Sequence, residues 1–534
     1  MPARLSERLL AEIIAPALLV ACSHASSLIR TPGGQLQGFV DADVEHYLGI
    51  PYAQPPVGAL RWRAPQPVPP REGILAVQDT PSACAQFIPL RKSLVGSEDC
   101  LYLNVWTPAA KPAEPMPVMV WLHGGGFIVG KGSYSDSDGL ELAAQNKVVV
   151  VTINYRLGVF GFMAHPALSE EDPDHPGSGN YGIEDQTAAL RWVRDNISAF
   201  GGDPDRVTVF GQSAGAISVC AQLASPLAAG LFQRAVIQSG PCVTPIPDLD
   251  SASTLGDAVA TGLGCDESSD LLACMRGNSA QAVADILAPD PTMGFNKKTM
   301  IWWPVQDDHV LPRQFMDAFE SGQFNRVPVI NGGTRDEGTL LVWMSHNLWF
   351  RPLQPEQYPT RLEYLLGSPE LAEQVAERYP LQNFASPFDA LSAAFGDGFF
   401  KCLSRRQGIA LSRQVPTWSY QFDYDRAPFL IPWADLKAFH SAEVQYVFDK
   451  PMRFYGGEFR AEEAGLASSM MGYWTQFARS GDPNGGDRTY WPPYGRDDQT
   501  LLLNLQNRVA TGVHAQDCLF WEELDYLRPV SIEP

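Results

Sequence analysis

The chain has 534 residues, of which 45% are hydrophobic and 19% charged, a balance typical of a globular protein with a sizeable core. This composition excludes disordered and fibrous classes. The formal net charge of −21 argues against nucleic acid as a partner, because binding phosphates requires a surplus of Lys and Arg, and it also disfavours docking on anionic membranes. The length alone favours two or more domains.

The chain begins with the features of an export signal. Arg4 and Arg8 precede an apolar run over 9–21, which has the length of a signal-peptide core and is too short to span a bilayer. A small-x-small site ending at Ala25 predicts a leader over 1–25 and a secreted or periplasmic protein. The four residues ending at Cys22 instead resemble a bacterial lipobox, so a lipid anchor at Cys22 is the alternative. No later stretch is long and apolar enough to predict a transmembrane span.

Short apolar, β-branched runs alternate with helical patterns along the rest of the chain. Such runs are typical of strands buried on both faces of a sheet. They lie at 118–122, 148–155, 206–210, 234–238, 327–331 and 418–422. The alternation predicts an α/β fold with a mostly parallel central sheet and helices on both faces, including a helix over 181–199. Between about 339 and 415 the pattern becomes largely helical, which predicts a helical insertion.

A candidate nucleophile lies in the pentapeptide Gly211-Gln212-Ser213-Ala214-Gly215. The segment stands between the predicted strand 206–210 and a predicted helix over 214–223. A serine on such a sharp strand-to-helix turn needs glycines on both sides, because the turn crowds the backbone. The pentapeptide alone occurs by chance, but this context predicts that Ser213 is a nucleophile.

A second glycine-rich segment, His123-Gly124-Gly125-Gly126-Phe127, directly follows the predicted strand 118–122. Acyl transfer requires backbone N–H groups aimed at the oxygen that becomes negatively charged. We therefore assign the oxyanion hole to the N–H groups of Gly125, Gly126 and Ala214. The alternative is a nucleotide-binding loop, but neither a GxGxxG pattern nor a P-loop lysine is present. His123 is expected to support the loop.

Five segments, taken in order, resemble the type-B carboxylesterases, a family that includes cholinesterases and some fungal lipases. They are EDCLYLNVW at 98–106, the HGGGF segment, NYRLG at 154–158, GGDP at 201–204 and the GQSAG pentapeptide. The similarity extends from about residue 29 to residue 521. It implies the α/β-hydrolase fold in a single catalytic domain over 26–534, with a helical subdomain at about 339–415. A single domain therefore replaces the two or more domains expected from the length alone.

The same resemblance, together with the chemistry of serine nucleophiles, predicts the other catalytic residues. A serine needs a base within hydrogen-bond reach, and the base needs a carboxylate that holds its tautomer. The base is His440 in the segment AFHSAE, and the acid is Glu337 in GTRDEG, so the order is Ser, acid, His. Asp336 is the local alternative for the acid. Ser239 resembles a family serine that supports the acid and base. No cofactor is expected.

The nine cysteines agree with export, and the chain has neither a CxxC motif nor a Cys/His cluster with zinc spacing, so no metal is expected. Spacing alone leaves the pairing open. The resemblance implies three disulfides, namely Cys84–Cys100, Cys265–Cys274 and Cys402–Cys518. Cys220 and Cys242 would then be free. The resemblance also implies two ion pairs, Arg61–Glu98 and Arg156–Asp203.

Departures from the family narrow the predicted substrate. The loop between Cys84 and Cys100 is too short for a lipase lid, and Phe87 is its only aromatic residue, where cholinesterases have a tryptophan. Gln212 replaces the glutamate that cholinesterases place before the serine. A quaternary ammonium would therefore lack its main partners. The candidate pocket residues are apolar and comprise Met300, Trp302, Leu340 and Leu341, with Trp303, Trp343, Trp349 and Phe350 as further candidates.

These features predict a serine carboxylesterase that hydrolyses small-molecule esters with small to medium acyl chains. The alternatives are a lipase acting on longer-chain acylglycerols and a non-catalytic adhesion-type member of the superfamily. The presence of Ser213, Glu337 and His440 argues against the adhesion-type alternative.

Overall fold

The computed structural model describes residues 25–88, 93–288, 301–346, 352–453, 456–524 and 526–527. The expected leader up to residue 24, including the lipobox residue Cys22, lies outside these residues. Within them, no helix combines the length and the apolar character that crossing a membrane requires.

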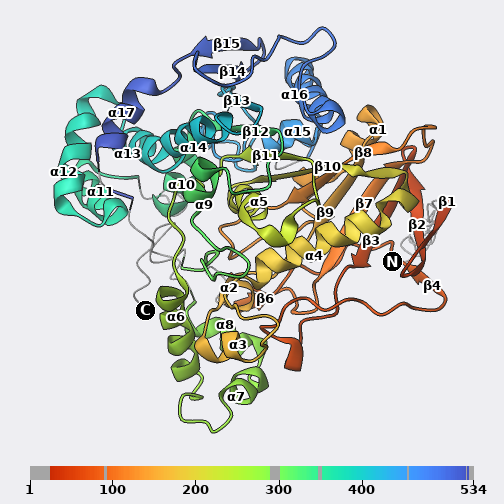
Figure 1. Ribbon diagram of the computed structural model, residues 1–534. Helices are drawn as coiled ribbons and strands as arrows, with labels where there is room; N and C mark the ends of the chain where they lie inside the picture. The colour runs from red at the N-terminus through yellow and green to blue at the C-terminus, as the bar shows by residue number, and fades with distance from the viewer. Residues whose placement is uncertain are drawn as a thin grey trace, which may run out of the picture.

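A 13-stranded sheet runs through the centre of the molecule (Figure 1). Its middle strands are parallel neighbours, in the order β9 (Val149–Ile153), β8 (Met116–Leu122), β10 (Gly202–Gln212), β11 (Arg234–Gln238), β12 (Val329–Thr334), β13 (Thr417–Phe422) and β14 (Gln499–Leu503). Every strand expected from the sequence overlaps one of these strands. The predicted mostly parallel sheet is therefore confirmed.

Antiparallel strands extend both edges of this parallel region. On one side lie β1 (Ala25–Thr31), β2 (Gly34–Asp41), β3 (Val44–Pro51) and β7 (Tyr102–Pro108), and on the other β15 (Arg508–Thr511). The short strand β4 (Ile74–Ala76) pairs with β2. These edge strands were not predicted from the sequence.

Helices cover both faces of the sheet, and this explains why the sequence of strand β8 is apolar throughout. All seven residues of β8 are buried. Val118, Val120 and Leu122 belong to a core that includes α4 (Tyr181–Asn196) and α5 (Ala214–Ala224). Met119 and Trp121 belong to a second core, which includes α1 (Leu140–Asn146), α15 (Val444–Val447) and α16 (Ala461–Ser480). Alternate residues of one strand thus supply two separate cores.

The segment after β12 is largely helical, as expected. It contains α10 (Glu337–His346), α11 (Tyr358–Leu366), α12 (Pro369–Arg378), α13 (Pro387–Gly396), the π-helical turn η7 (Asp397–Lys401) and α14 (Cys402–Ser412). Several of these helices gather at the left of the molecule in Figure 1. Local sequence sets two of their starts, because Ser368 and Ser386 cap α12 and α13 and a proline follows each serine.

Four disulfides connect the described chain, and three of them are the expected ones: Cys84–Cys100, Cys265–Cys274 and Cys402–Cys518. The fourth joins Cys220 to Cys242, so the expectation that these two cysteines are free is wrong. Cys220 lies on α5, which packs against β11, and Cys242 follows β11 by four residues. The bridge thus ties the helix to the segment that leaves the neighbouring strand.

One of the two expected ion pairs is confirmed and the other is wrong. Both guanidinium nitrogens of Arg61 that face Glu98 lie 2.6 Å from its carboxylate. Arg156 pairs with Asp185 instead of Asp203, through contacts of 2.8 and 2.7 Å between buried side chains. Asp185 also accepts the backbone N–H of Arg156, so both the main chain and the side chain of Arg156 select it.

Asp203, on β10, pairs with Arg206 three residues later on the same strand.

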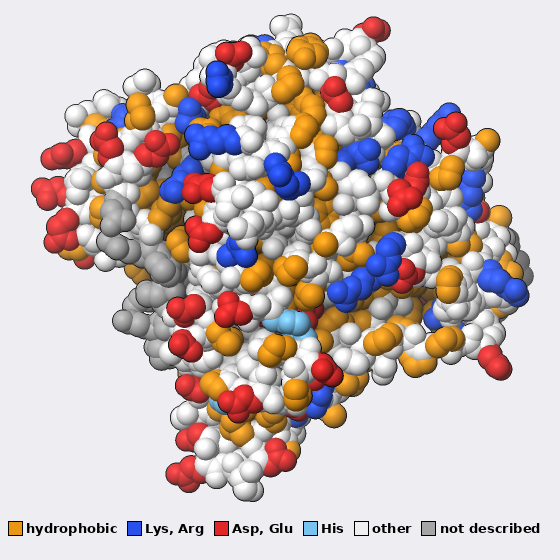
Figure 2. All heavy atoms as spheres, viewed as in Figure 1, with side chains coloured by type: hydrophobic (Ala, Val, Ile, Leu, Met, Phe, Trp, Pro, Cys, Tyr) orange, Lys and Arg blue, Asp and Glu red, His pale blue; other side chains and the backbone are white. Residues whose placement is uncertain are grey.

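Charged side chains of both signs spread over the face shown in Figure 2, with acidic groups prominent at the left and lower ends and basic groups across the middle. The surplus of acidic residues in the sequence favours solubility of such a surface.

Candidate active site

Ser213 lies between the last residue of β10 and the first residue of α5, at the carboxyl edge of the parallel strands. Its backbone has φ 58° and ψ −124°, a conformation that costs non-glycine residues roughly 1–3 kcal/mol and occurs mainly at functional sites. The Ser213 N–H donates to the carbonyl of Gln238 at 2.9 Å, which fixes the turn against β11. The side chain is partly exposed, so a substrate can reach it.

The glycines around Ser213 permit two close approaches. A Cβ on Gly215 would lie 2.0 Å from the carbonyl oxygen of Leu122, so only glycine lets the start of α5 pack on the end of β8. A Cβ on Gly124 would lie 3.1 Å from the Cβ of Ser213. The glycine loop after β8 therefore runs directly beside the serine.

Three backbone N–H groups near Ser213 are available to a ligand. Gly125 and Gly126 have φ of 114° and 62°, and the Gly125 carbonyl accepts from the N–H of Val129 at 3.0 Å, which closes the loop. Within the described part of the chain, the N–H groups of Gly125 and Gly126 donate no hydrogen bond. The N–H of Ala214 is the first of α5 and has no acceptor within its own helix. Such donors can stabilise a developing oxyanion.

His123 supports the glycine loop, and within the described residues its ring forms no hydrogen bond with Ser213. Its ring stacks on Tyr155 with 4.3 Å between centroids, and the Tyr155 hydroxyl donates to the His123 carbonyl at 2.7 Å. Burial lowers the pKa of His123 to about 4, so the ring is neutral at neutral pH. This placement agrees with the supporting role expected from the sequence.

Glu337 and His440 form a buried pair. Glu337 is the first residue of α10, just after β12, and its Oε2 lies 2.6 Å from Nδ1 of His440. Its other oxygen, Oε1, accepts from the Ser239 hydroxyl and from the Thr334 N–H, each at 2.7 Å. Glu337 is 1% exposed and His440 5%. This arrangement fixes the carboxylate and places a proton on Nδ1, which leaves Nε2 as the basic nitrogen.

The rival acid, Asp336, is engaged elsewhere. Its Oδ2 lies 2.8 Å from a guanidinium nitrogen of Arg335 and accepts the N–H of Ala438 at 3.1 Å. The structure thus brings Glu337 to His440, while Asp336 anchors the segment that leads into the histidine.

The Nε2 atom of His440 faces the turn that carries Ser213. Within the described residues, the hydrogen bond at His440 Nε2 comes from the Gln212 side-chain amide at 3.0 Å and not from the Ser213 hydroxyl. Gln212 directly precedes Ser213, so His440 lies close to the turn that carries the serine. Catalytic hydrogen bonds are often long without substrate and tighten when it binds.

Sequence reasoning missed two residues around this pair. The ring of Phe400 packs on His440 with 4.9 Å between centroids, and it belongs to the π-helical turn η7, a feature often found at functional sites. Glu443 is fully buried three residues after His440 and accepts from Gln238 Nε2 at 3.3 Å. Its proximity to His440 in sequence was a usable signal, whereas nothing in the sequence marked the π-helical turn.

Glu443 should make stability depend on pH. Burial, together with the charge of Glu337, raises the pKa of Glu443 from 4.5 to about 7. Between pH 4.5 and about pH 7 the folded protein keeps a proton on Glu443 that the unfolded chain has lost. The free energy of unfolding therefore falls as the pH rises through this range, and the fall is complete above about pH 7. In the wild type this fall in the free energy of unfolding amounts to about 3 kcal/mol, and we expect it to be absent in Glu443→Gln. Urea unfolding of both proteins at pH 5 and pH 8 measures this, and equal pH dependence would contradict it.

The described candidate pocket residues are divided between the two cores, with Trp302 and Trp303 in the first and Leu340 and Trp343 packed against the second. Trp302 and Trp303 are buried, and the ring of Trp303 lies 5.9 Å from that of Phe127 in the glycine loop. Leu340 packs on the second core, together with Trp343, and Leu341 is partly exposed. Met300, Trp349 and Phe350 lie outside the described residues. Of these side chains, Trp303 has the clearest contact with the predicted oxyanion loop.

Comparisons with known proteins identify the family to which the chain belongs. The model of the carboxylesterase family matches residues 25–521. The chain is 37% identical to the para-nitrobenzyl esterase of Bacillus subtilis over 492 residues, which cover 90% of this chain and 95% of the relative. It is 34% identical to the human cocaine esterase over 535 residues, covering 93% and 91%.

A solved structure of PNB esterase superimposes with a TM-score of 0.78 at 34% identity, covering 93% of this chain and all of that one. The mostly parallel sheet, with helices on both faces, is therefore the α/β-hydrolase fold. With the family match over nearly the whole described chain, these similarities show that the protein belongs to the carboxylesterase family and is a carboxylic-ester hydrolase.

Proposed function

We propose that the protein hydrolyses esters with small to medium acyl chains through an acyl-enzyme on Ser213. His440 is the general base, and Glu337 holds it in position. The observation that carries this proposal is the buried contact of 2.6 Å between Glu337 and His440, next to a serine with a strained backbone. A nucleophile, a base and an orienting carboxylate are the three parts that serine hydrolases need.

In the first half of the reaction, Ser213 Oγ attacks the ester carbonyl carbon and His440 Nε2 takes the hydroxyl proton. The N–H groups of Gly125, Gly126 and Ala214 stabilise the resulting oxyanion. The intermediate collapses, the alkoxide takes the proton from His440 and leaves as the alcohol, and Ser213 remains acylated.

In the second half, His440 removes a proton from water as the water attacks the acyl group. The second intermediate collapses, the proton returns to Ser213 Oγ and the carboxylic acid is released. Glu337 stabilises the imidazolium in both halves. The Ser239 hydroxyl, 2.7 Å from Glu337, is proposed to hold that carboxylate in place.

Two features support uncharged substrates of modest size. Gln212 puts a neutral amide against His440, where cholinesterases have a carboxylate, so a cationic group gains no charged partner there. The Cys84–Cys100 bridge closes a loop with a sequence separation of only 16 residues, which includes the short antiparallel strands β5 (Gln86–Ile88) and β6 (Ser93–Val95). A loop of this length offers little material for a lid over a long acyl chain.

A series of p-nitrophenyl esters tests the proposed chain length. We expect kcat/KM to be highest between butyrate and octanoate and to fall for laurate and palmitate. A preference for emulsified long-chain acylglycerols over soluble short esters would instead indicate a lipase and would refute the proposed substrate class.

We also propose that the protein is exported and that residues 26–534 act as one catalytic unit. Support comes from the signal-like leader and from four disulfides, which persist mainly in oxidising compartments. Mass spectrometry of the mature protein from culture medium and membranes tests this. A mature N-terminus at residue 26 indicates secretion, a lipid on Cys22 indicates an anchor, and an intact leader on cytoplasmic protein argues against export.

A further inference from the structure

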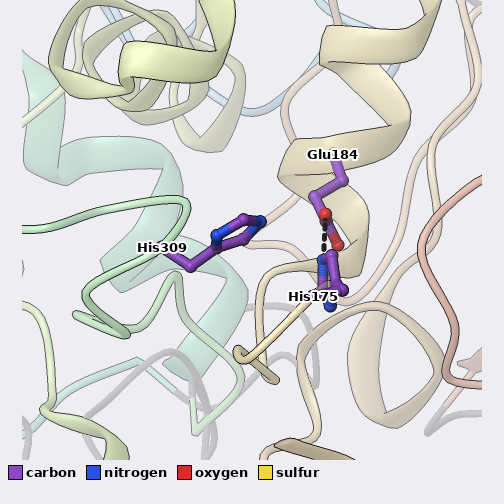
Figure 3. A group of neighbouring side chains, drawn as sticks. All are labelled: His175, Glu184 and His309. Carbon is purple, nitrogen blue, oxygen red and sulfur yellow. Dashed lines mark hydrogen bonds and ion pairs between the residues drawn. The ribbon is translucent and has the colours of Figure 1, made fainter. Parts of the chain in front are cut away.

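A second group of reactive side chains lies outside the proposed catalytic residues. His175, Glu184 and His309 come together so that one ligand atom from each lies within 4.8 Å of the others (Figure 3). Glu184 is in the first turn of α4, His175 is on the loop before that helix, and His309 is on a loop far along the chain. We call these three residues the His-Glu cluster. In Figure 3 the His309 ring extends from its loop at the left toward the His175–Glu184 pair at the right.

The carboxylate of Glu184 is only half used by the protein. Its Oε1 lies 2.5 Å from Nε2 of His175. The residue is 7% exposed, and its Oε2 is buried with no hydrogen-bond partner among the described residues. A buried carboxylate oxygen without a partner lowers the stability of the fold, and a ligand bound to this oxygen would offset that loss.

Asp307 adds a second half-used carboxylate beside the His-Glu cluster. Its Oδ1 accepts the backbone N–H groups of His309, Val310 and Leu311 at 2.8–3.2 Å, which shapes the loop that carries His309. Its Oδ2 is buried and also has no partner within the described chain. Two buried carboxylates beside the imidazole rings therefore favour a positive charge at this site.

An ordinary structural ion pair between His175 and Glu184 accounts for only part of this arrangement. It satisfies one oxygen of Glu184 and leaves the other orphaned. It also gives no role to His309. The His309 ring meets the His175 ring edge-on, with 4.8 Å between centroids, and forms no side-chain hydrogen bond with another described residue. A cation held between the three side chains would give each of them a partner.

We propose that His175, Glu184 and His309 bind one divalent transition-metal ion of the zinc type. Two imidazole nitrogens and one carboxylate oxygen are a donor set that zinc uses, whereas calcium and magnesium prefer oxygen donors alone. On binding, His175 releases its Nε2 proton to solvent, and that nitrogen and the Glu184 carboxylate contact the metal. Asp307 or water completes the coordination.

The bound ion would join the loop before α4 to the segment that carries His309. These two segments already contact each other, because the Asn180 side chain exchanges two hydrogen bonds with the backbone of Val305. The proposal departs from the expectation, drawn from sequence, that the protein binds no metal. The three ligands lie at 175, 184 and 309, too far apart to form a recognisable spacing motif.

Zinc binding to the intact, tag-free protein tests the proposal. After removal of metals with a chelator, competition with a chromophoric chelator measures the zinc stoichiometry and Kd. We expect one equivalent per chain, with Kd raised by at least roughly 10–100-fold in His309→Ala and in Glu184→Gln. His440→Ala is the matched control, because zinc bound at the proposed active site would be lost in that variant alone.

Thermal unfolding gives a second readout that does not depend on catalysis. Zinc should raise the midpoint of the wild type and of His440→Ala, but not that of His309→Ala, and magnesium should raise none of them. His309 is partly exposed, so its replacement is compatible with folding, which circular dichroism verifies. Absence of bound zinc in the wild type, or an unchanged Kd in both cluster variants, would overturn the proposal.

Discussion

Replacing Ser213 with alanine is expected to lower kcat for a p-nitrophenyl ester by at least about 10³-fold. The variant keeps the glycine loop and the Glu337–His440 pair, so it retains the residual catalysis that an oxyanion hole provides. It lacks the oxygen that forms the acyl-enzyme. Because the loss affects the chemical step, KM should change far less than kcat. Initial rates over a range of substrate concentrations separate the two constants.

The matched control is Ser218→Ala, which removes a hydroxyl from α5, the helix that follows Ser213. Ser218 is buried and accepts a hydrogen bond from Gln186 at 2.9 Å, so its loss tests the packing of α5 without touching the proposed nucleophile. Activity should persist in this variant. An organophosphate should label wild-type Ser213, as a peptide mass shift, and leave Ser213→Ala unlabelled. Near-normal turnover by Ser213→Ala would refute the assignment.

The elements that place Ser213 could be predicted because their signals are local. An apolar run before the serine and a helical pattern after it became β10 and α5, and the flanking glycines proved necessary for close packing. The parallel strands were predictable for a similar reason, since burial on both faces leaves almost no polar residues in β8. The edge strands β1, β2 and β3 gave weaker signals because their burial alternates irregularly with exposure.

The wrong predictions concerned contacts between segments distant in sequence. Asp185 and Asp203 are both acidic residues downstream of Arg156, and only the packing of α4 against the Arg156 backbone decides between them. The pairing of Cys220 with Cys242 likewise depends on α5 lying against β11. For Arg156 the resemblance to a family implied a partner that this chain does not use, and for the two cysteines it implied no partner at all.

The acid was the one catalytic residue with a close competitor, and two matched substitutions separate the candidates. We expect Glu337→Gln to lower kcat/KM by roughly 10⁴-fold, because an amide at this position holds the imidazole in the wrong tautomer and cannot stabilise the imidazolium. The cause is direct, since Glu337 Oε2 is 2.6 Å from His440 Nδ1. The substitution preserves the size of the side chain, so the burial around it is disturbed little.

Asp336→Asn should cost less than about 10-fold, because an amide oxygen can still accept the N–H of Ala438. Arg335 loses one partner but keeps its contact with Asp423 at 3.2 Å. Both variants make the same chemical change one residue apart, so a general effect of losing a carboxylate would lower their activities equally. Equal losses in kcat/KM, with unchanged thermal midpoints, would show that Asp336 shares the role of the acid. A large loss confined to Glu337→Gln would identify the carboxylate that orients His440.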